Sequence, residues 1–434
     1  MKSHLDPSLV QRLGWEPGGL RIAYVSSYPP RECGIATFCQ DLVTSTKGAD
    51  GAGEPMIIAM ESAQDNQAYE RPVTLTVDDK TPLDYEAAAD YINGSSAKLV
   101  CLQHEFGIFG GTEERSLYLF LNRLEKPLVA TLHTVTPRPT QARIGLMREL
   151  SWRADRLVVM NRIAKDLLVH EYGISARKVI MIHHGAPEFP RAEKEPAKAR
   201  LGLEGRTVMS TFGLVSRGKG IEYALEALPQ VVARYPEVLY LIIGKTHPSV
   251  QRYEKESYRD ELCRRIAELG LENNVRFINH YLTKAEIIEY LAATDIYVTP
   301  YLNPEQITSG TMAYAVAAGK AIVSTPYLYA RFLLEEGRGI LVDFRDGAGL
   351  AEAFGRILDN PALQHHLENL TYSYGRGMLW SVVGRQYMNL YRQVLAEQDV
   401  VVATAPAVAP LAATAQLREE NLHGHLRPRK TSIA

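Results

Sequence analysis

Short apolar runs alternate with helical patterns along most of the chain. The first run, residues 21–27, is followed by two prolines and Gly34, and then by apolar residues at helical spacing that include Phe38 and Leu42. The same order of strand, loop and helix recurs, with a helix expected at 112–126 and further apolar runs at 99–106, 127–134, 156–161 and 178–185. Such runs, separated by amphipathic helices, are typical of a parallel sheet covered on both faces.

A second series of short apolar strands follows a polar stretch at 190–205, which we interpret as the connection between two domains. Its strands lie at 206–215, 238–245, 274–281, 295–301 and 320–327. Two consecutive series of this kind predict an α/β chain with two Rossmann-like domains that face each other across a cleft.

These two series set the expected domain boundaries. We expect an N-terminal domain at 20–190, a C-terminal domain at 191–377 and a long helix at 378–397. The apolar residues on or near one face of that helix are Trp380, Val383, Tyr387, Leu390 and Tyr391. Residues 398–434 begin with a stretch rich in Val, Ala and Pro, and we expect no regular structure there.

Composition and charge exclude several classes of protein. Of 434 residues, 46% are hydrophobic and 23% charged, which is ordinary for a soluble globular protein. Lys and Arg number 48 against 50 Asp and Glu, a formal charge of −2, so bulk nucleic-acid binding is not expected. The four irregularly spaced cysteines, together with the lack of a signal-peptide pattern or a long apolar segment, predict a cytoplasmic protein.

The loops after the strands are where ligands bind in open α/β sheets. Gly34 stands before a helix start, where unpaired N–H groups favour an anionic or polyhydroxyl ligand, although a tight turn alone would also need a glycine. His104 and His133 each follow an apolar strand and could donate to a sugar hydroxyl or a phosphate oxygen. A histidine in the core is the alternative for each. For His183 and His184 we favour the structural role.

Two further loops have residues suited to phosphate. In 212–229, Arg217 and Lys219 lie among glycines immediately before a helix, an arrangement that suits a diphosphate although it matches neither a P-loop nor G-x-G-x-x-G. In 303–327, Glu305 lies just upstream of a helix start of small hydroxyl residues and glycine. A solvated basic turn and an ordinary capped helix are the respective alternatives.

The order of these features resembles the retaining glycosyltransferases of family 4, which have the GT-B fold. The resemblance rests on the Gly34 loop, His133, Lys219-Gly220, Gly244 after a strand, and residues 305–319 followed by AIVST. It covers about residues 20–397. It implies transfer of a sugar from a nucleotide diphosphate donor with retention and without a metal. It also implies that the Trp380 helix crosses back onto the N-terminal domain.

The resemblance implies a role for individual residues. Gly34 would approach the donor diphosphate, His133 would touch the transferred sugar, and Lys219 would bind the diphosphate. Glu305 would stand at the first glutamate of the family's E-x7-E motif and hydrogen-bond the donor sugar. The amides that would cap the phosphates belong to Ser309, Gly310 and Thr311.

The chain also departs from the family pattern. Leu214 stands where the family has an arginine, and Arg217 is the candidate to replace it as a donor-binding residue. Counting back from Gly319 places the second glutamate at Tyr314 and the first at Gln306, so both residues are donor-binding candidates, and the assignment to Glu305 needs a shift of one residue. These changes put the ribose contact and the nucleotide preference in question.

The sequence therefore predicts a metal-independent, retaining glycosyltransferase that moves a hexosyl group from a nucleotide sugar to a sugar or other hydroxyl acceptor. Lys219, Arg217 and the amides at 309–311 would stabilise the departing diphosphate, which could itself accept the acceptor's proton. His104 is the candidate for acceptor or sugar binding. A nucleotide-sugar epimerase, a phosphorylase of the same fold and a nucleotide-sugar-binding protein with a degenerate motif are the alternatives.

Contact with a membrane surface is a separate question. Residues 138–156 carry five arginines, and members of the family often dock on lipid through basic helices of the first domain. A peripheral membrane contact is therefore one interpretation of this segment, and a solvated charged face is the one we favour.

Overall fold

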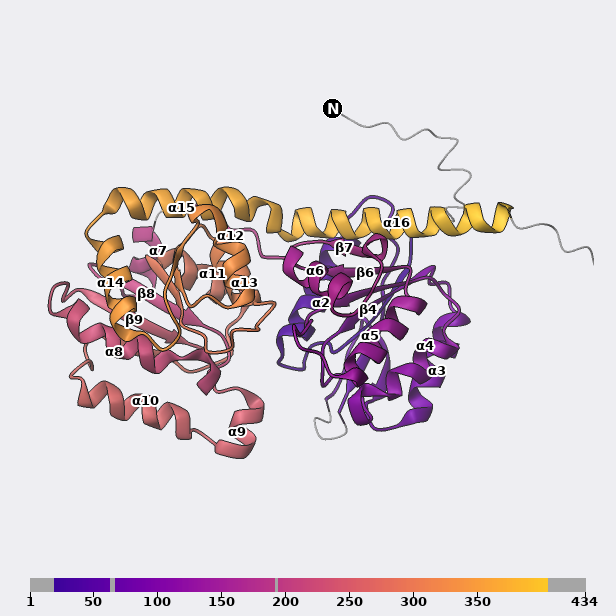
Figure 1. Ribbon diagram of the computed structural model, residues 1–434, viewed down its shortest axis with the longest axis horizontal. Coiled ribbons are helices and arrows are strands. Elements are labelled where there is room, and N and C mark those ends of the chain that lie inside the picture. Colours follow the sequence, from indigo (N-terminus) through magenta and orange to yellow (C-terminus); the bar gives the residue numbers. More distant parts are fainter. Residues whose placement is uncertain (1–18, 63–66, 192–193, 405–434) are drawn as a thin grey trace, which may run out of the picture. The chain divides into compact units, whose positions relative to one another are not determined.

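Parallel strands form two separate sheets in the computed structural model, which describes residues 19–62, 67–191 and 194–404 (Figure 1). The first sheet has seven strands in the order β3-β2-β1-β4-β5-β6-β7. These are β1 (Ile22–Ser26), β2 (Met56–Glu61), β3 (Val73–Asp78), β4 (Leu99–His104), β5 (Leu128–Leu132), β6 (Arg156–Val159) and β7 (Val179–Met181). Every pairing is parallel, as the alternation of apolar runs with helices predicts.

The second sheet has six parallel strands in the order β10-β9-β8-β11-β12-β13. These are β8 (Thr207–Phe212), β9 (Val238–Ile243), β10 (Val275–Ile278), β11 (Ile296–Thr299), β12 (Ala321–Ser324) and β13 (Ile340–Leu341). In both sheets the order of strands reverses beside the first strand of the series, at β1 and at β8. Such a reversal opens a crevice at the carboxyl ends of the strands, and this places the site described below.

Helices connect the strands and cover the sheets. In the first half they are α2 (Gly34–Lys47), α3 (Pro82–Asn93), α4 (Ser116–Arg123), α5 (Gln141–Arg153) and α6 (Arg162–His170). In the second half they are α7 (Lys194–Arg200), α8 (Ile221–Val232), α9 (Pro248–Glu254), α10 (Ser257–Glu268), α11 (Lys284–Ala293), α12 (Gly310–Ala317), α13 (Leu328–Leu333), α14 (Gly347–Leu358) and α15 (Pro361–Gly375).

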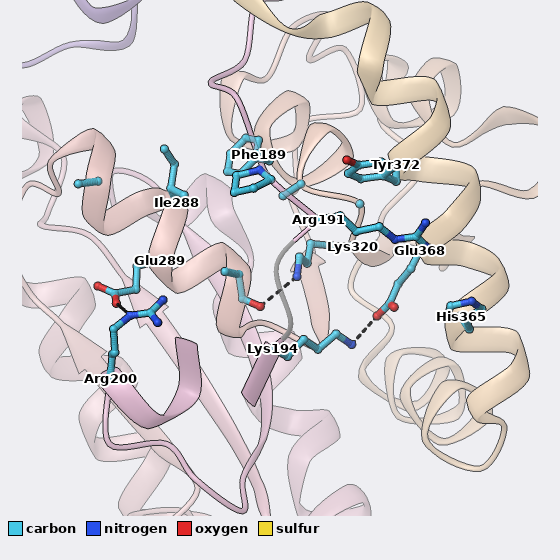
Figure 2. Close-up of a pocket in the computed structure, with 15 residues that line it drawn as sticks. Phe189, Arg191, Lys194, Arg200, Ile288, Glu289, Lys320, His365, Glu368 and Tyr372 are labelled. Carbon is cyan, nitrogen blue, oxygen red and sulfur yellow. Dashed lines mark hydrogen bonds and ion pairs between the residues drawn. The ribbon is translucent and has the colours of Figure 1, made fainter. Parts of the chain in front are cut away.

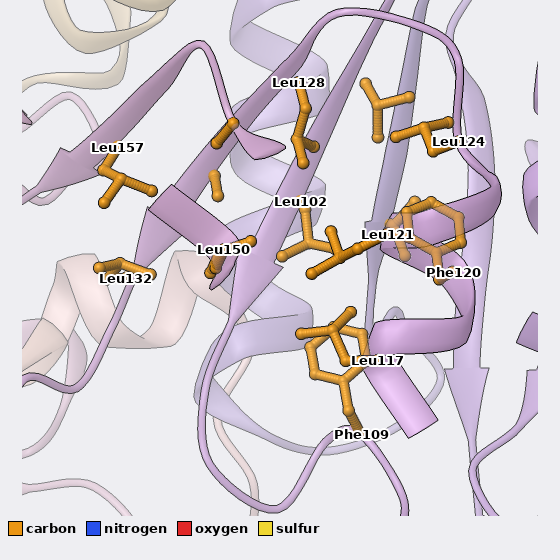
Figure 3. Close-up of a cluster of buried hydrophobic side chains, with 14 of the residues drawn as sticks. Leu102, Phe109, Leu117, Phe120, Leu121, Leu124, Leu128, Leu132, Leu150 and Leu157 are labelled. Carbon is orange, nitrogen blue, oxygen red and sulfur yellow. The ribbon is translucent and has the colours of Figure 1, made fainter. Parts of the chain in front are cut away.

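Apolar side chains between strands and helices form the core of each half. Figure 3 shows part of the largest cluster of the first half, where Leu102 and Leu128 from adjacent strands meet Leu117 and Leu121 of α4. The corresponding cluster of the second half packs β8, β9, β11 and β12 against α8, α10 and α14. Each cluster lies between one face of its sheet and the helices on that face, which leaves the carboxyl ends of the strands for binding.

The long helix α16 (Trp380–Thr404) packs on the first half, although it follows the second half in sequence. Trp380, Tyr387 and Tyr391 are buried in one cluster with residues of β1 and α2. The Trp380 ring lies so close to Gly185 that any side chain there would collide with it. The expected return of this helix onto the N-terminal half is confirmed, and the compact unit that holds both sheets ends at Ala396.

Several expected elements differ in the structure. The stretch 190–205 contains the short helix α7, whose buried Lys198 pairs with Asp295 at 2.9 Å, a contact that its polar sequence does not reveal. The helix expected at 112–126 begins with a separate 3₁₀ turn and then becomes α4 (Ser116–Arg123), because Glu113 and Glu114 have positive φ. Helix α16 continues to Thr404, past the expected end at 397. The rest of the tail, 405–434, lies outside the described residues.

The helices and cysteines of the described residues show two further properties. None of the helices within the described ranges is long and apolar enough to cross a membrane. All four cysteines are described, and none of them forms a disulfide. Cys39 and Cys101 are buried, and burial raises the pKa of the Cys101 thiol to about 12, so this thiol stays protonated and unreactive at neutral pH.

Candidate functional site

A cavity of about 660 Å³ lies at the carboxyl ends of strands from both sheets. The loop after β1, the residues that follow β4, β5 and β7, and the loops after β8, β9 and β10 all contribute to its lining. The first turns of α2, α11 and α12 complete the walls. Since ligands bind at this edge in open α/β sheets, this cavity is the candidate functional site.

The first turn of α2 supplies one wall. Cys33 caps this helix, with its sulfur accepting from the backbone N–H of Ala36 at 3.4 Å. The helix has no acidic residue in its first turn, so its N-terminal partial positive charge is not offset there. Gly34, the first helical residue, lines the cavity, and a Cβ added to it would meet nothing within 4 Å. Packing alone therefore does not require a glycine here, and its lack of a side chain leaves room for a ligand.

His133 lines the cavity as a neutral, buried imidazole. Its Nε2 lies 2.9 Å from Oε1 of Gln103, and its ring makes an edge contact with Phe38 at 4.7 Å between centroids. Burial, reinforced by the neighbouring His184 and His104, holds the pKa of His133 well below its usual range. Since the Gln103 oxygen can only accept, Nε2 carries the proton and Nδ1 is left as an acceptor. Such a ring suits uncharged hydroxyl groups.

The loop after β8 brings Lys219 to the opposite wall. Its ammonium lies 3.9 Å from the centroid of the Tyr301 ring and has no carboxylate partner among the described residues. Gly213 and Gly244, both with positive φ, allow the ends of β8 and β9 to approach closely, because a Cβ on Gly244 would lie 2.2 Å from the Gly213 carbonyl oxygen. The Lys219 ammonium is thus available at the cavity to bind an anion.

The start of α12 forms the floor beside Lys219. Ser309 is the N-cap, and its hydroxyl accepts from the backbone N–H of Met312 at 3.3 Å. Gly310 and Thr311 line the cavity, and Thr311 Oγ1 lies 2.9 Å from the Tyr301 hydroxyl. No acidic residue occupies the first turn of α12. The N–H groups of this turn and the Lys219 ammonium thus present positive charge to the same cavity.

The structure brings together six of the predicted residues at this cavity. They are Gly34, His133, Lys219, Gly310, Thr311 and Tyr314. Ser309 lies in the same segment, but its side chain is buried and used as the helix cap.

Four predicted site residues are not among the residues that line the cavity. His104 is fully buried, 2.9 Å from Glu114 and stacked on Phe109, because its side chain points into the core. Arg217 pairs instead with Glu254 at 3.3 Å and Glu261 at 2.7 Å.

The other two residues lie in the turn after β11. Glu305 forms an ion pair with Arg138, and Nε2 of Gln306 donates to the Thr308 carbonyl at 3.1 Å. Neither side chain is among those that line the cavity. Thr308 and the helix start that follows do line it.

Several cavity residues were not predicted. Glu105 follows β4 and accepts from the Thr134 hydroxyl at 2.9 Å, and burial raises the pKa of its carboxyl group. His184 lines the cavity as well, and burial lowers its pKa to about 4. Lys245 and Lys284 add two ammonium groups. Glu105 and Lys245 come directly after strands, so the position rule that selected the histidines could have found them.

The five arginines at 138–156 make contacts of several kinds. Arg138 forms an ion pair with Glu305, and Arg143 lies over the Phe106 ring at 4.3 Å. The remaining three arginines donate to backbone carbonyls, Arg148 to Tyr172, Arg153 to Leu121, Leu124 and Lys126, and Arg156 to Asp155. Arg138 and Arg148 are exposed to solvent, and both the solvated charged face and the peripheral membrane contact stay predictions.

A second cavity, of about 520 Å³, lies in the second half at the edge where the strands begin (Figure 2). Three basic residues at this cavity have partners within the protein. Lys194 contacts Glu368, and Arg200 pairs with Glu289 at 2.6 Å. Lys320 donates to two carbonyls at the C-terminal end of α11. Figure 2 shows these contacts across the cavity. Burial lowers the pKa of Lys320 to about 8. This arrangement is that of a structural charge network.

Among the described residues, no group of three or more His, Cys, Asp or Glu side chains is placed to hold a metal ion. The positive charge at the first cavity comes from Arg31, from lysines and from helix N-termini.

The second half of the chain matches a known protein family. Residues 193–374 match the family described as Glycosyl transferases group 1. The D-inositol 3-phosphate glycosyltransferase of Nocardioides sp. is 27% identical over 297 residues, which are 62% of this chain and 63% of the relative. The phosphatidyl-myo-inositol mannosyltransferase of Mycolicibacterium smegmatis is 28% identical over 281 residues, 64% of this chain and 67% of the relative.

Solved structures resemble the chain over most of its length. The sucrose-phosphate synthase of Thermosynechococcus elongatus has a TM-score of 0.70 at 18% identity. The match covers 87% of this chain and 100% of the synthase chain. Anabaena HepE, solved in complex with UDP, has a TM-score of 0.69 at 18% identity, with 86% of this chain and 100% of that chain covered. At this identity the likeness establishes the fold, and the expected GT-B architecture is confirmed.

Proposed function

We propose that this chain, whose residues 193–374 match the glycosyl transferases group 1, transfers a glycosyl group from a nucleoside diphosphate sugar to a hydroxyl acceptor at the 660 Å³ cavity. The proposal rests on one observation. The Lys219 ammonium and the first turns of α2 and α12, which contain no acidic residue, all line the same cavity. An anion with two phosphate groups matches several positive groups at one cavity.

During the transfer, negative charge builds up on the departing diphosphate. When the bond between the anomeric carbon and the diphosphate oxygen breaks, its electron pair leaves with the diphosphate. Lys219 and the backbone N–H groups at Gly310 and Thr311 stabilise that added negative charge, and they do so without reorganisation because the helix holds them in place. A neutral His133 contacts the hydroxyl groups of the transferred sugar, which its low pKa favours.

We further propose that the transfer retains the anomeric configuration and needs no metal ion. In a retaining transfer the acceptor's oxygen bonds to the anomeric carbon on the face that the diphosphate leaves, and the departing phosphate oxygen takes the acceptor's proton. No separate base is needed in such a step. Two sources of charge, lysine and helix N-termini, take over the stabilisation that a divalent cation would give.

The acceptor is proposed only as a class. The relatives named above act on inositol phosphate or phosphatidylinositol by their names, and the likeness supports a polyhydroxyl acceptor for this chain. Glu105 and His133, both at the cavity and both from the first half, offer acceptors for hydroxyl groups.

A donor panel tests the proposal. Purified protein is mixed with UDP-glucose, UDP-N-acetylglucosamine or GDP-mannose, with and without myo-inositol and glucose 6-phosphate, and release of UDP or GDP is measured. Release from at least one donor, undiminished by EDTA, is expected. Release that is abolished by EDTA and restored by Mg²⁺ would contradict metal independence, and no release from any donor would contradict the activity itself.

A further inference from the structure

A buried carboxylate on α2 connects the two halves behind the wall of the cavity. Asp41 is only 3% exposed and does not line the cavity. One of its oxygens pairs with the ammonium of Lys284, and the other accepts from the Tyr314 hydroxyl at 3.4 Å. Both partners belong to the second half, and both line the cavity. Asp41 therefore contacts two groups of the binding wall from behind.

The energetics of this contact favour a functional role. A carboxylate taken out of water is costly unless it is paired, and an asparagine would avoid that cost. Lys284 is the first residue of α11, where the helix dipole disfavours a cation. Asp41 is thus stabilised by Lys284 and Tyr314, and Lys284, whose side chain is about half exposed, is stabilised by Asp41. Burial, and next the charge of Asp41, raise the pKa of Tyr314, which keeps its hydroxyl protonated as a donor.

Two more contacts on the same segment repeat the arrangement. The hydroxyl of Thr37, one helical turn before Asp41, lies 3.1 Å from that of Tyr281. Glu32, just before α2, forms an ion pair with Lys245, which lines the cavity. One face of α2 and the residues before it thus contact the loops that follow β9 and β10, together with α11 and α12.

We propose that Asp41 is a positioning residue that holds Lys284 and Tyr314 in place to bind the nucleoside diphosphate. The inference rests on the proposed function, because it assumes that this ligand occupies the cavity. It adds that the binding wall is complete only when α2 contacts α11 and α12. The affinity of the second half for a nucleoside diphosphate then depends on a residue of the first half that does not touch the ligand.

A double-mutant cycle with UDP and GDP tests the proposal. Isothermal titration of wild type, Asp41→Asn, Lys284→Met and the double variant gives four dissociation constants for each nucleotide. We expect Asp41→Asn to weaken binding at least fivefold for the nucleotide that binds better. In the Lys284→Met background the same change should weaken it by less than twofold, because the ammonium that Asp41 positions is already absent.

Matched variants keep the result interpretable. Glu54→Gln removes a carboxylate from an exposed ion pair with Lys47, at the end of the same helix, and should leave both affinities unchanged. Tyr314→Phe removes one hydroxyl, leaves the buried ion pair intact and should weaken binding about twofold or more. This variant tests the contact even if Asp41→Asn does not fold.

The remaining outcomes would overturn either the inference about Asp41 or the proposed function. Unchanged affinity in Asp41→Asn, or an equal loss with and without Lys284, would show that Asp41 acts through the fold at large and would overturn the inference. Wild type that binds neither UDP nor GDP, and releases neither from the donor panel, would overturn the proposed function instead.

Discussion

The two cavities are similar in size and both contain lysines, yet they differ in how their charges are arranged. At the first, the Lys219 ammonium meets an aromatic ring, and two helix N-termini without acidic residues face the same space. At the second, Lys194 and Arg200 contact carboxylates, and Lys320 donates to the C-terminal end of α11. This difference supports the first cavity as the proposed anion site, because a cation without a protein partner at the carboxyl ends of strands can bind a ligand, whereas the basic residues of the second cavity already have partners.

The largest expected effect is the loss of Lys219. Lys219→Ala removes the cation that faces the leaving diphosphate, at a cost of about 2–4 kcal/mol of transition-state stabilisation, or roughly 30- to 1,000-fold in kcat/KM. Its thermal unfolding midpoint should stay close to that of wild type, because Lys219 makes no ion pair among the described residues. Steady-state release of UDP or GDP measures the loss, and a rate equal to wild type would place the phosphate site elsewhere.

Lys320, at the second cavity, should affect stability and not turnover. Its folded-state pKa is lowered to about 8 from 10.5, so between these pH values the unfolded chain binds more protons than the folded chain. Stability therefore gains with rising pH across that window, by up to about 3 kcal/mol. Denaturant unfolding of wild type and Lys320→Met at pH 7.5, 9 and 10.5 should show this gain in wild type alone. Equal pH profiles, or a changed kcat/KM at neutral pH, would contradict the structural role.

Gly34 should give an intermediate effect that separates ligand from packing. Gly34→Ala places a methyl group where the protein has nothing within 4 Å, so folding stability should stay within about 0.5 kcal/mol of wild type. If a ligand approaches this backbone, its affinity should fall by about tenfold. Titration of UDP and GDP, paired with thermal unfolding, measures both quantities. Unchanged affinity would show that the ligand does not reach the first turn of α2.

The smallest expected effect is that of Arg217, two residues before Lys219. Because its guanidinium pairs with Glu254 and Glu261 on the exposed surface, Arg217→Ala should change kcat/KM by less than about twofold and stability by less than about 1 kcal/mol. A loss comparable with that of Lys219→Ala would show that this arginine leaves its partners to bind the donor.

Much of the fold was predictable from the sequence because parallel strands are continuous apolar runs. The runs at 21–27 and 206–215 predict β1 and β8 to within a few residues, and the strand ends then locate His133 and Lys219 at the cavity. The short helix α7 was not predictable in this way, because its buried Lys198 is stabilised by Asp295, far along the chain.

The differences between the predicted site residues and the cavity lining have a common physical cause. Position after a strand indicates the edge of the sheet, but it does not fix where a side chain points. His104 and Glu105 are adjacent, and the structure buries the first against Glu114 while the second lines the cavity. Asp41 lies among buried apolar residues of α2, and this polar residue on a buried face was the only local signal of its contacts with the second half.

The most direct test of the account is to find where a nucleoside diphosphate binds. Hydrogen–deuterium exchange of wild type with saturating UDP, and separately GDP, reports protection along the chain. We expect slower exchange at the starts of α2 and α12 and in residues 213–220, with no change at 361–372 beside the second cavity. Protection confined to the second cavity, with none at residues 213–220 or the start of α12, would contradict it.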